Sequence, residues 1–290
     1  MPELPEVELA ARAVRRVALG QRVVHVGHAP GTGRSSIDAL RWIDLAGLTL
    51  LGVRRHGKQL AFDFSGDTTL LLHLGMTGRF DLPAPDEALA AQWRFHLDLE
   101  NGQRLVFCDQ RRFARARLMT TVECACLSDV SGLGPDAFEA SLDQWTNVMS
   151  SASRPVKPLL LDQAKLAGIG NIYACEGLWR AGIDPRTPAN AVSSEAVATL
   201  RGGVTSAIRD TLDRERDTLV RYLSEGGTDN PFDLYDREGK PCRRCGAPIE
   251  RFTQAGRSTW HCPSCQPAWY PPSGPARSHR ATSPGRSPRR

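Results

Sequence analysis

Long apolar runs, an export signal and internal repeats are all missing from this sequence. None of its apolar stretches approaches the roughly 20 residues that a membrane-spanning helix needs. The first residues, MPELPEVE, are acidic and lack the apolar core of a signal peptide. These absences argue against a membrane or exported protein, and we expect a globular protein of the cytoplasm.

Acidic residues are scarce at the C-terminal end. Residues 242–290 hold nine arginines and one glutamate, a net charge of +8, whereas the whole chain of 290 residues carries +5. The first 241 residues therefore carry −3. A basic end suits a polyanionic partner, although a merely solubilising tail would account for its last part equally well.

The first half of the chain shows one helical pattern followed by many short strands. Apolar residues at helical spacing predict a helix over residues 3–19: Leu4, Val7, Ala11, Val14 and Ala18. Turn residues separate the strands, which we expect over 22–27, 48–54, 59–64, 69–74, 95–99, 104–108 and 115–119. Because these strands follow one another without intervening helices, they favour a β-sandwich.

The second half is expected to be helical. The predicted helices cover 141–151, 155–166, 171–181, 194–212 and 215–224. The tail, rich in Pro, Ser and Arg, is expected to be disordered. The predicted fold class is α+β, with four parts: a β-sandwich domain (1–134), a helical domain (135–230), a cysteine-bearing module (235–266) and a basic tail (267–290).

The cysteine-bearing module has the spacing of a zinc site. Cys242 and Cys245 form one Cys-x-x-Cys pair, and Cys262 and Cys265 form a second pair after sixteen intervening residues. Such pairs grip a metal from two sides, which favours one structural Zn²⁺ over two disulfides or a redox pair. We expect the remaining cysteines to be ordinary thiols: Cys108, Cys124, Cys126 and Cys175.

An arginine stands near the tip of the hairpin that the two cysteine pairs would enclose. Arg257 follows Gln254, Ala255 and Gly256. A rigid tip that carries an arginine suits contact with a phosphate or insertion into a groove. For this module alone, a solvated arginine would be the simpler interpretation.

The N-terminus offers a possible nucleophile. Removal of the initiator methionine would leave the secondary amine of Pro2 at the chain end, beside the carboxyl group of Glu3. An α-amine has a reference pKa of about 7.7–8, so more of it is neutral near pH 7 than of a lysine. Attack on the anomeric carbon of a sugar would form an iminium and permit elimination of phosphate, with Glu3 as acid or base. Without further context, the same residues are only a helix start.

Several short blocks together resemble the formamidopyrimidine-DNA glycosylase and endonuclease VIII family, over roughly residues 1–266. The blocks are MPELPEVE, Gly57-Lys58, residues 73–78 (HLGMTG), residues 109–113 (DQRRF), residues 168–174 (GIGNIYA) and the four cysteines. Each block is modest by itself, but their order and spacing make the resemblance specific. It implies a β-sandwich joined to a helix–two-turn–helix domain and a zinc finger.

The resemblance also implies roles in the chemistry. Pro2 matches the family's nucleophile, Glu3 its general acid, and Lys58 a lysine that contacts the phosphate of the lesion and assists catalysis. Glu6 matches a second acid, for which positioning of the site is the expected role. A solvated lysine at a strand start is the alternative for Lys58.

Further matches imply contacts with DNA. Met76, Arg111 and Phe113 match side chains that fill the gap left by an extruded nucleotide, for which a thioether, a guanidinium and an aromatic ring are suited. Burial in the core is the alternative for Met76 and Phe113. Asn171 and Arg257 match residues that bind phosphate, with an ordinary N-cap as the alternative for Asn171.

The sequence departs from the family pattern in three places. Gln110 stands where a proline is usual and Ala114 where a glycine is usual, and both changes look tolerable. Only a few residues separate Thr228 from Tyr235, so the loop that closes over a flipped oxidised guanine is short. We therefore expect weak activity on 8-oxoguanine and stronger activity on abasic sites.

The function implied by the resemblance is a bifunctional DNA glycosylase and abasic-site lyase of base excision repair. It would act as a monomer on damaged double-stranded DNA, in a bacterial cytoplasm and at the nucleoid when bound. Two alternatives remain: a non-catalytic protein of the same fold that binds damaged DNA, and a zinc-ribbon transcription or structural factor. The intact Pro2-Glu3 pair and Lys58 argue against the first, and the β-rich N-terminal half argues against the second.

Overall fold

The computed structural model describes residues 2–30, 36–84, 86–216 and 230–269. Three predictions lie wholly or partly outside the described residues: most of the helix over 215–224, the short loop after Gly226, and nearly all of the tail. Within these ranges, no helix has the length and hydropathy that a bilayer crossing needs. The domain limits given above stay our proposed division of the chain.

Two antiparallel sheets of four strands form the N-terminal sandwich, as the pattern predicted. One sheet has the order β1-β6-β7-β5, formed by Val23–His28, Trp93–Leu99, Arg104–Cys108 and Arg79–Asp81. The other has the order β2-β3-β4-β8, formed by Leu50–His56, Gln59–Phe64, Thr68–His73 and Arg115–Met119. Strand β5 was not predicted, because three residues are too few for alternation to show.

Aromatic rings fill the space between the sheets. Phe62 of β3 meets Phe80 of β5 edge to face, with the ring centroids 5.8 Å apart. Phe95 and Phe107 stack at 5.1 Å, and both are buried. Helix α1 (Leu4–Ala18) adds the apolar face that the sequence predicted, and all five of its predicted residues are buried.

The second half is helical. Its helices are α2 (Leu127–Ser131), α3 (Leu142–Ser150), α4 (Val156–Leu160), α5 (Asn171–Ala181) and α6 (Ser194–Arg214). The helix expected over 155–166 is shorter in the structure: α4 ends at Leu160, and a turn follows it. The Gln163 side chain holds this turn, since its amide donates to the carbonyls of Leu161 and Ile169 and its oxygen accepts from the N–H of Gly168. This turn brings α5 back against the N-terminal segment.

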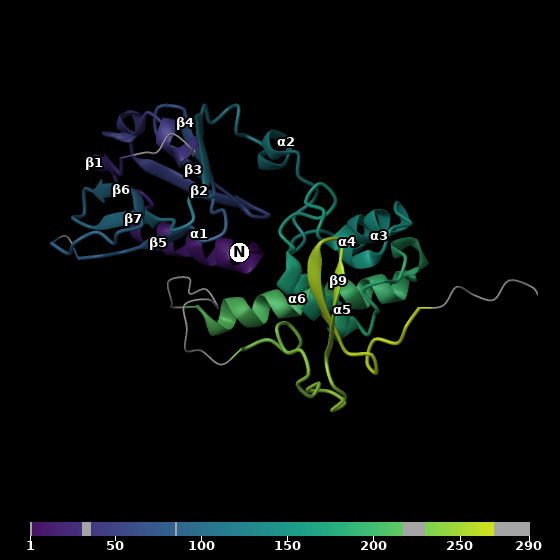
Figure 1. Cartoon of the computed structure of the whole chain (residues 1–290). Helices are drawn as coiled ribbons and strands as arrows, with labels where there is room; N and C mark the ends of the chain where they lie inside the picture. Colours follow the sequence, from purple (N-terminus) through teal and green to yellow (C-terminus); the bar gives the residue numbers. More distant parts are fainter. Residues whose placement is uncertain (1, 31–35, 85, 217–229, 270–290) are drawn as a thin grey trace, which may run out of the picture.

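The two halves meet around the start of α1, which Figure 1 shows between the sheets and the helical half. The Arg55 side chain is only 5% exposed and pairs with both Glu8 of α1 and Asp136 of the helical half. Asp136 also accepts a 2.7 Å hydrogen bond from the backbone N–H of Gly57. These contacts fix the β2–β3 turn, which carries Lys58, against the helices.

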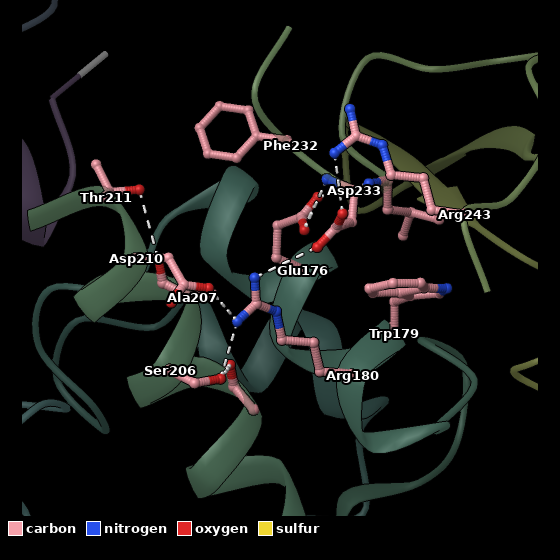
Figure 2. Close-up of polar contacts among 12 residues, drawn as sticks. Glu176, Trp179, Arg180, Ser206, Ala207, Asp210, Thr211, Phe232, Asp233 and Arg243 are labelled. Atoms are coloured by element: carbon pink, nitrogen blue, oxygen red, sulfur yellow. Dashed lines mark hydrogen bonds and ion pairs between the residues drawn. The ribbon is translucent and has the colours of Figure 1, made fainter. Parts of the chain in front are cut away.

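A polar network joins the zinc module to helix α5. The buried carboxylate of Glu176 accepts the backbone N–H groups of residues 233–235 at 2.8–3.2 Å, and Figure 2 shows it beside Asp233. Arg180 of α5 pairs with Asp210 of α6 and with Asp233, which also pairs with Arg243 (Figure 2). The chain that enters the module is therefore anchored to the helices.

Candidate active site

Glu3 is held at the N-terminus of helix α5. Its Oε1 accepts the N–H of Ile172 at 3.0 Å, and its Oε2 accepts the N–H of Tyr173 at 3.3 Å. The residue is only 2% exposed. Free N–H groups and the helix dipole both stabilise a carboxylate at this place. The acid beside Pro2 is thus fixed by a helix 169 residues further along the chain.

Gly170 makes this contact possible. A Cβ atom at Gly170 would lie 2.1 Å from the carboxyl carbon of Glu3, so any larger residue would push the carboxylate out of its present place. Gly170 is also the N-cap of α5, so Asn171 is the first helical residue and not the cap. The alternative that Asn171 is an ordinary N-cap is therefore wrong, and the GIGN block is explained by the approach of Glu3.

Glu6 is partly buried beside Glu3. Its Oε2 accepts the N–H of Glu3 at 2.8 Å, and its Oε1 lies 3.1 Å from the hydroxyl of Tyr173. That hydroxyl also lies 3.0 Å from Oγ1 of Thr211. Burial, together with the charge of Glu3, raises the pKa of Glu6 to about 7. Both carboxylate oxygens of Glu6 thus have partners within the protein, and positioning of Glu3 stays its proposed role.

The raised pKa of Glu6 predicts a pH dependence of stability. An unfolded glutamate has a pKa near 4.5, so between that value and about 7 the folded protein binds more protons. The stabilising contribution is complete below the lower value and is lost as the pH rises through about 7. Its full size is on the order of 3 kcal/mol. Denaturant unfolding at several pH values should show a flatter profile for Glu6→Gln, and an unchanged slope would contradict this.

Lys58 lies in the same site. It follows Gly57 in the β2–β3 turn and is 8% exposed. Burial lowers the pKa of Lys58, the charges of Glu3 and Glu6 oppose that shift, and the charge of Arg257 adds to it. The alternative of a solvated lysine is wrong. Pro2, next to Glu3, is buried as well.

The predicted gap-filling residues lie on two adjoining loops. The loop of Met76 and that of Arg111 and Phe113 are joined through Asp109, whose Oδ1 accepts the Thr77 hydroxyl at 2.5 Å. Gly75 approaches the other loop so closely that a Cβ there would lie 2.5 Å from the Ala114 nitrogen. Phe113 is 52% exposed, with the Arg111 guanidinium 4.9 Å from its ring centroid. Phe113 is therefore not a core residue, and Met76 is half-buried.

The zinc hairpin packs on the start of α5. Its strands are β9 (Glu250–Gln254) and β10 (Arg257–His261), so Arg257 follows the turn, as expected. The Asn171 amide donates to the carbonyl of Ser258 at 2.9 Å. The buried Lys157 donates to the same carbonyl at 3.1 Å and to the Thr259 hydroxyl at 2.6 Å. Arg257 is thereby placed next to the site that contains Glu3 and Lys58.

The four cysteines fit one zinc ion. Their sulfur atoms all lie within 4.8 Å of one another. Cys242 and Cys265 are 3.9 Å apart and Cys245 and Cys262 3.4 Å apart at sulfur, too long for disulfides and close to the roughly 3.8 Å edge of a tetrahedral ZnS₄ site. With four protein ligands and no open position, this is a structural zinc.

Some residues of this region escaped the sequence-based predictions. Lys157 had no local signal, because its partners lie 101 and 102 residues away. Tyr173 and Asp109 lie in the GIGNIYA and DQRRF blocks, but only the structure shows their contacts with Glu6 and Thr77. A buried polar side chain needs a hydrogen-bond partner, and when that partner is distant in the sequence, the sequence gives no sign of the pair.

Fold and site together define the class: a zinc-finger protein with a β-sandwich and a helical domain, in which the N-terminus of helix α5 binds the buried carboxylate of Glu3. The N-terminal domain of formamidopyrimidine-DNA glycosylase matches residues 1–116, its H2TH domain residues 132–222, and the zinc finger found in FPG and IleRS residues 239–268. The chain belongs to the formamidopyrimidine-DNA glycosylase family.

Individual relatives agree with this assignment. The formamidopyrimidine-DNA glycosylase of Roseiflexus sp. is 39% identical, covering 92% of this chain and 100% of the relative, and that of Chloroflexus aurantiacus is 35% identical, covering 92% and 98%. Among solved structures, the Lactococcus lactis Fpg in complex with abasic-site DNA superposes with a TM-score of 0.81 at 27% identity. That comparison covers 92% of this chain and 100% of the other.

Proposed function

We propose that this protein is a bifunctional DNA glycosylase and abasic-site lyase of base excision repair. One observation carries the proposal: the acid next to Pro2 is buried on the N-terminus of α5, close enough to the buried Lys58 for its charge to affect the pKa of that lysine. A protein that only binds DNA needs no buried acid beside a terminal amine. Family membership supports the same activity.

The proposed reaction uses the amine of Pro2 after removal of the initiator methionine. The amine bonds to C1′ of deoxyribose while the bond from C1′ to the base breaks, and Glu3 supplies the proton for the departing group or the ring oxygen. Opening of the sugar ring gives an iminium between Pro2 and C1′. The iminium makes the C2′ proton acidic, and its removal by a base expels the 3′ phosphate by β-elimination. Removal of the C4′ proton from the resulting unsaturated iminium then expels the 5′ phosphate by δ-elimination. Water then releases the sugar fragment from Pro2.

Binding of DNA is proposed to use the positions described above. Lys58, Asn171 and Arg257 would hold phosphates on both sides of the lesion and keep the strand bent. A phosphate near Lys58 would favour its charged form and so offset the effect of burial. Met76, Arg111 and Phe113 would enter the gap, a role that the exposure of Phe113 supports. Glu6 would position Glu3 through its backbone N–H. We propose that the protein acts as a monomer on double-stranded DNA.

Borohydride trapping tests the covalent step. The full-length protein, incubated with abasic-site duplex and sodium borohydride, should give a stable adduct at Pro2, located by peptide mass spectrometry. The double variant Pro2→Gly plus Glu3→Gln should give at least about a hundredfold less adduct, since both the secondary amine and the acid are gone. An undiminished adduct, or a protein that binds lesion DNA and never cuts it, would refute the proposal and favour the non-catalytic alternative.

The short loop after Thr228 predicts the order of substrates. Single-turnover cleavage should be fast on abasic-site duplex, intermediate on ring-opened purines or oxidised pyrimidines, and slowest on 8-oxoguanine, because little chain is available to cover that base. A panel of duplexes that differ only in the lesion measures this order. Excision of 8-oxoguanine as fast as abasic-site cleavage would show that the loop does not limit recognition.

A further inference from the structure

A second group of metal-ligand side chains lies on the outer face of the β1-β6-β7-β5 sheet. His25 of β1 stands directly opposite Asp98 of β6, and His96 points from the same face of β6, two residues before Asp98. Atoms of these three residues that can bind a metal all lie within 4.8 Å of one another. No step of the proposed repair reaction uses them.

The geometry suits a small divalent ion. Oδ2 of Asp98 lies 3.1 Å from Nδ1 of His25 and 3.7 Å from Nε2 of His96. Zinc binds nitrogen and oxygen at about 2.0–2.2 Å, so two ligands of a tetrahedral ion lie roughly 3.3–3.5 Å apart. The two observed distances lie on either side of that value. Three protein ligands leave a further position for water on the exposed side of His25.

His96 is the observation that favours a metal over a simple cross-strand ion pair. It is only 8% exposed, and neither of its ring nitrogens has a hydrogen-bond partner in the described part of the chain. A buried ring nitrogen without a partner is unusual, because buried polar groups are nearly always bonded.

The surroundings also make room for the ring and hold the acid. His96 lies over Gly27 of β1, where a Cβ would lie 2.1 Å from its Cε1 atom, so a larger residue at position 27 would displace the ring from its present place. Arg104 donates from Nε to Oδ1 of Asp98 at 2.5 Å and from Nη2 to Oδ2 at 3.2 Å. These hydrogen bonds orient the Asp98 carboxylate so that Oδ2 faces the two histidines. Residues that do not touch the metal often orient its ligands in this way.

We propose that His25, His96 and Asp98 form a binding site for a divalent transition-metal ion, which links the edge strand β1 to β6. The class of ion follows from the ligands, because imidazole and carboxylate together suit Zn²⁺ and its neighbours in the first transition row. The site is separate from the four-cysteine zinc and requires no step of the proposed function.

Zinc itself is the probe. The full-length protein, with zinc already bound to its four cysteines, is dialysed against buffers of fixed free zinc concentration. The number of zinc ions bound per chain is then measured by elemental mass spectrometry. We expect one zinc per chain without added metal and a second one on titration. His25→Ala changes an exposed ligand and should weaken the second site by more than about tenfold, since loss of even an outer partner of a metal ligand costs about 10–100-fold.

His28→Ala is the matched control, because it removes an exposed histidine from the same strand and should leave the second zinc in place. Asp98→Asn tests the carboxylate independently of the histidines, with circular dichroism to show that the sheet is intact. The proposal is overturned if zinc stops at one per chain, or if His25→Ala and Asp98→Asn both retain the second ion. Neither result bears on base excision.

Discussion

Glu3→Gln is expected to slow base release by about 10²–10⁴-fold, the contribution of a positioned proton donor or acceptor. This corresponds to about 3–5 kcal/mol of transition-state stabilisation. Glutamine keeps the size of the side chain but cannot supply the proton. The side-chain NH₂ group of the glutamine would also face the N-terminus of α5, where the Glu3 carboxylate now accepts hydrogen bonds from the N–H groups of Ile172 and Tyr173. Cleavage of abasic-site DNA should fall less, because that substrate has already lost its base.

The measurement is single-turnover cleavage of a lesion duplex and of an abasic duplex by native protein and variant. Glu195→Gln is the control: it removes the charge of an exposed glutamate from the first turn of another helix, α6, and should leave both rates unchanged. Thermal unfolding separates a loss of chemistry from a loss of fold. If Glu3→Gln released bases at the native rate, Glu3 would not be the acid.

Much of the fold could be predicted because its signals are local. The apolar face of α1 and strands such as Gln59–Phe64 follow from spacing within a few residues, and the structure places them as expected. The end of α4 at Leu160 could not be predicted, because a side chain, Gln163, fixes the turn beyond it. Helical spacing continues in the sequence past the point where tertiary contacts end the helix.

The site was predictable in composition but not in arrangement. Pro2, Glu3 and Lys58 stand in short blocks that the sequence displays, and the resemblance supplied their expected roles. The contact between Glu3 and α5, however, joins residues 169 positions apart, and no periodicity reports it. The burial of Lys157 depends likewise on the zinc hairpin. Long-range contacts of this kind set the electrostatics of the site, and they had to be seen in the structure.

Removal of the zinc should have the second large effect. Structural zinc contributes about 10–16 kcal/mol to the folding of small zinc modules. Cys262→Ser removes a fully buried ligand and should leave the hairpin over residues 250–261 unfolded. Amide hydrogen exchange should then rise in β9 and β10 and remain slow in α6, which belongs to the main apolar core and not to the cluster around the cysteines. Cys126→Ser, an exposed cysteine outside the cluster, is the control.

Loss of the hairpin should also weaken DNA binding, although no cysteine needs to touch DNA. Unfolding would break the bonds from Asn171 and Lys157 to Ser258, and would remove Arg257 from the site that contains Lys58. Lys157 would then lose its hydrogen bonds to Ser258 and Thr259. Titration of abasic duplex should show weaker binding with a smaller dependence on salt, as expected when fewer phosphate contacts are made. Native affinity in the zinc-free variant would mean that the finger does not place Arg257 on the DNA.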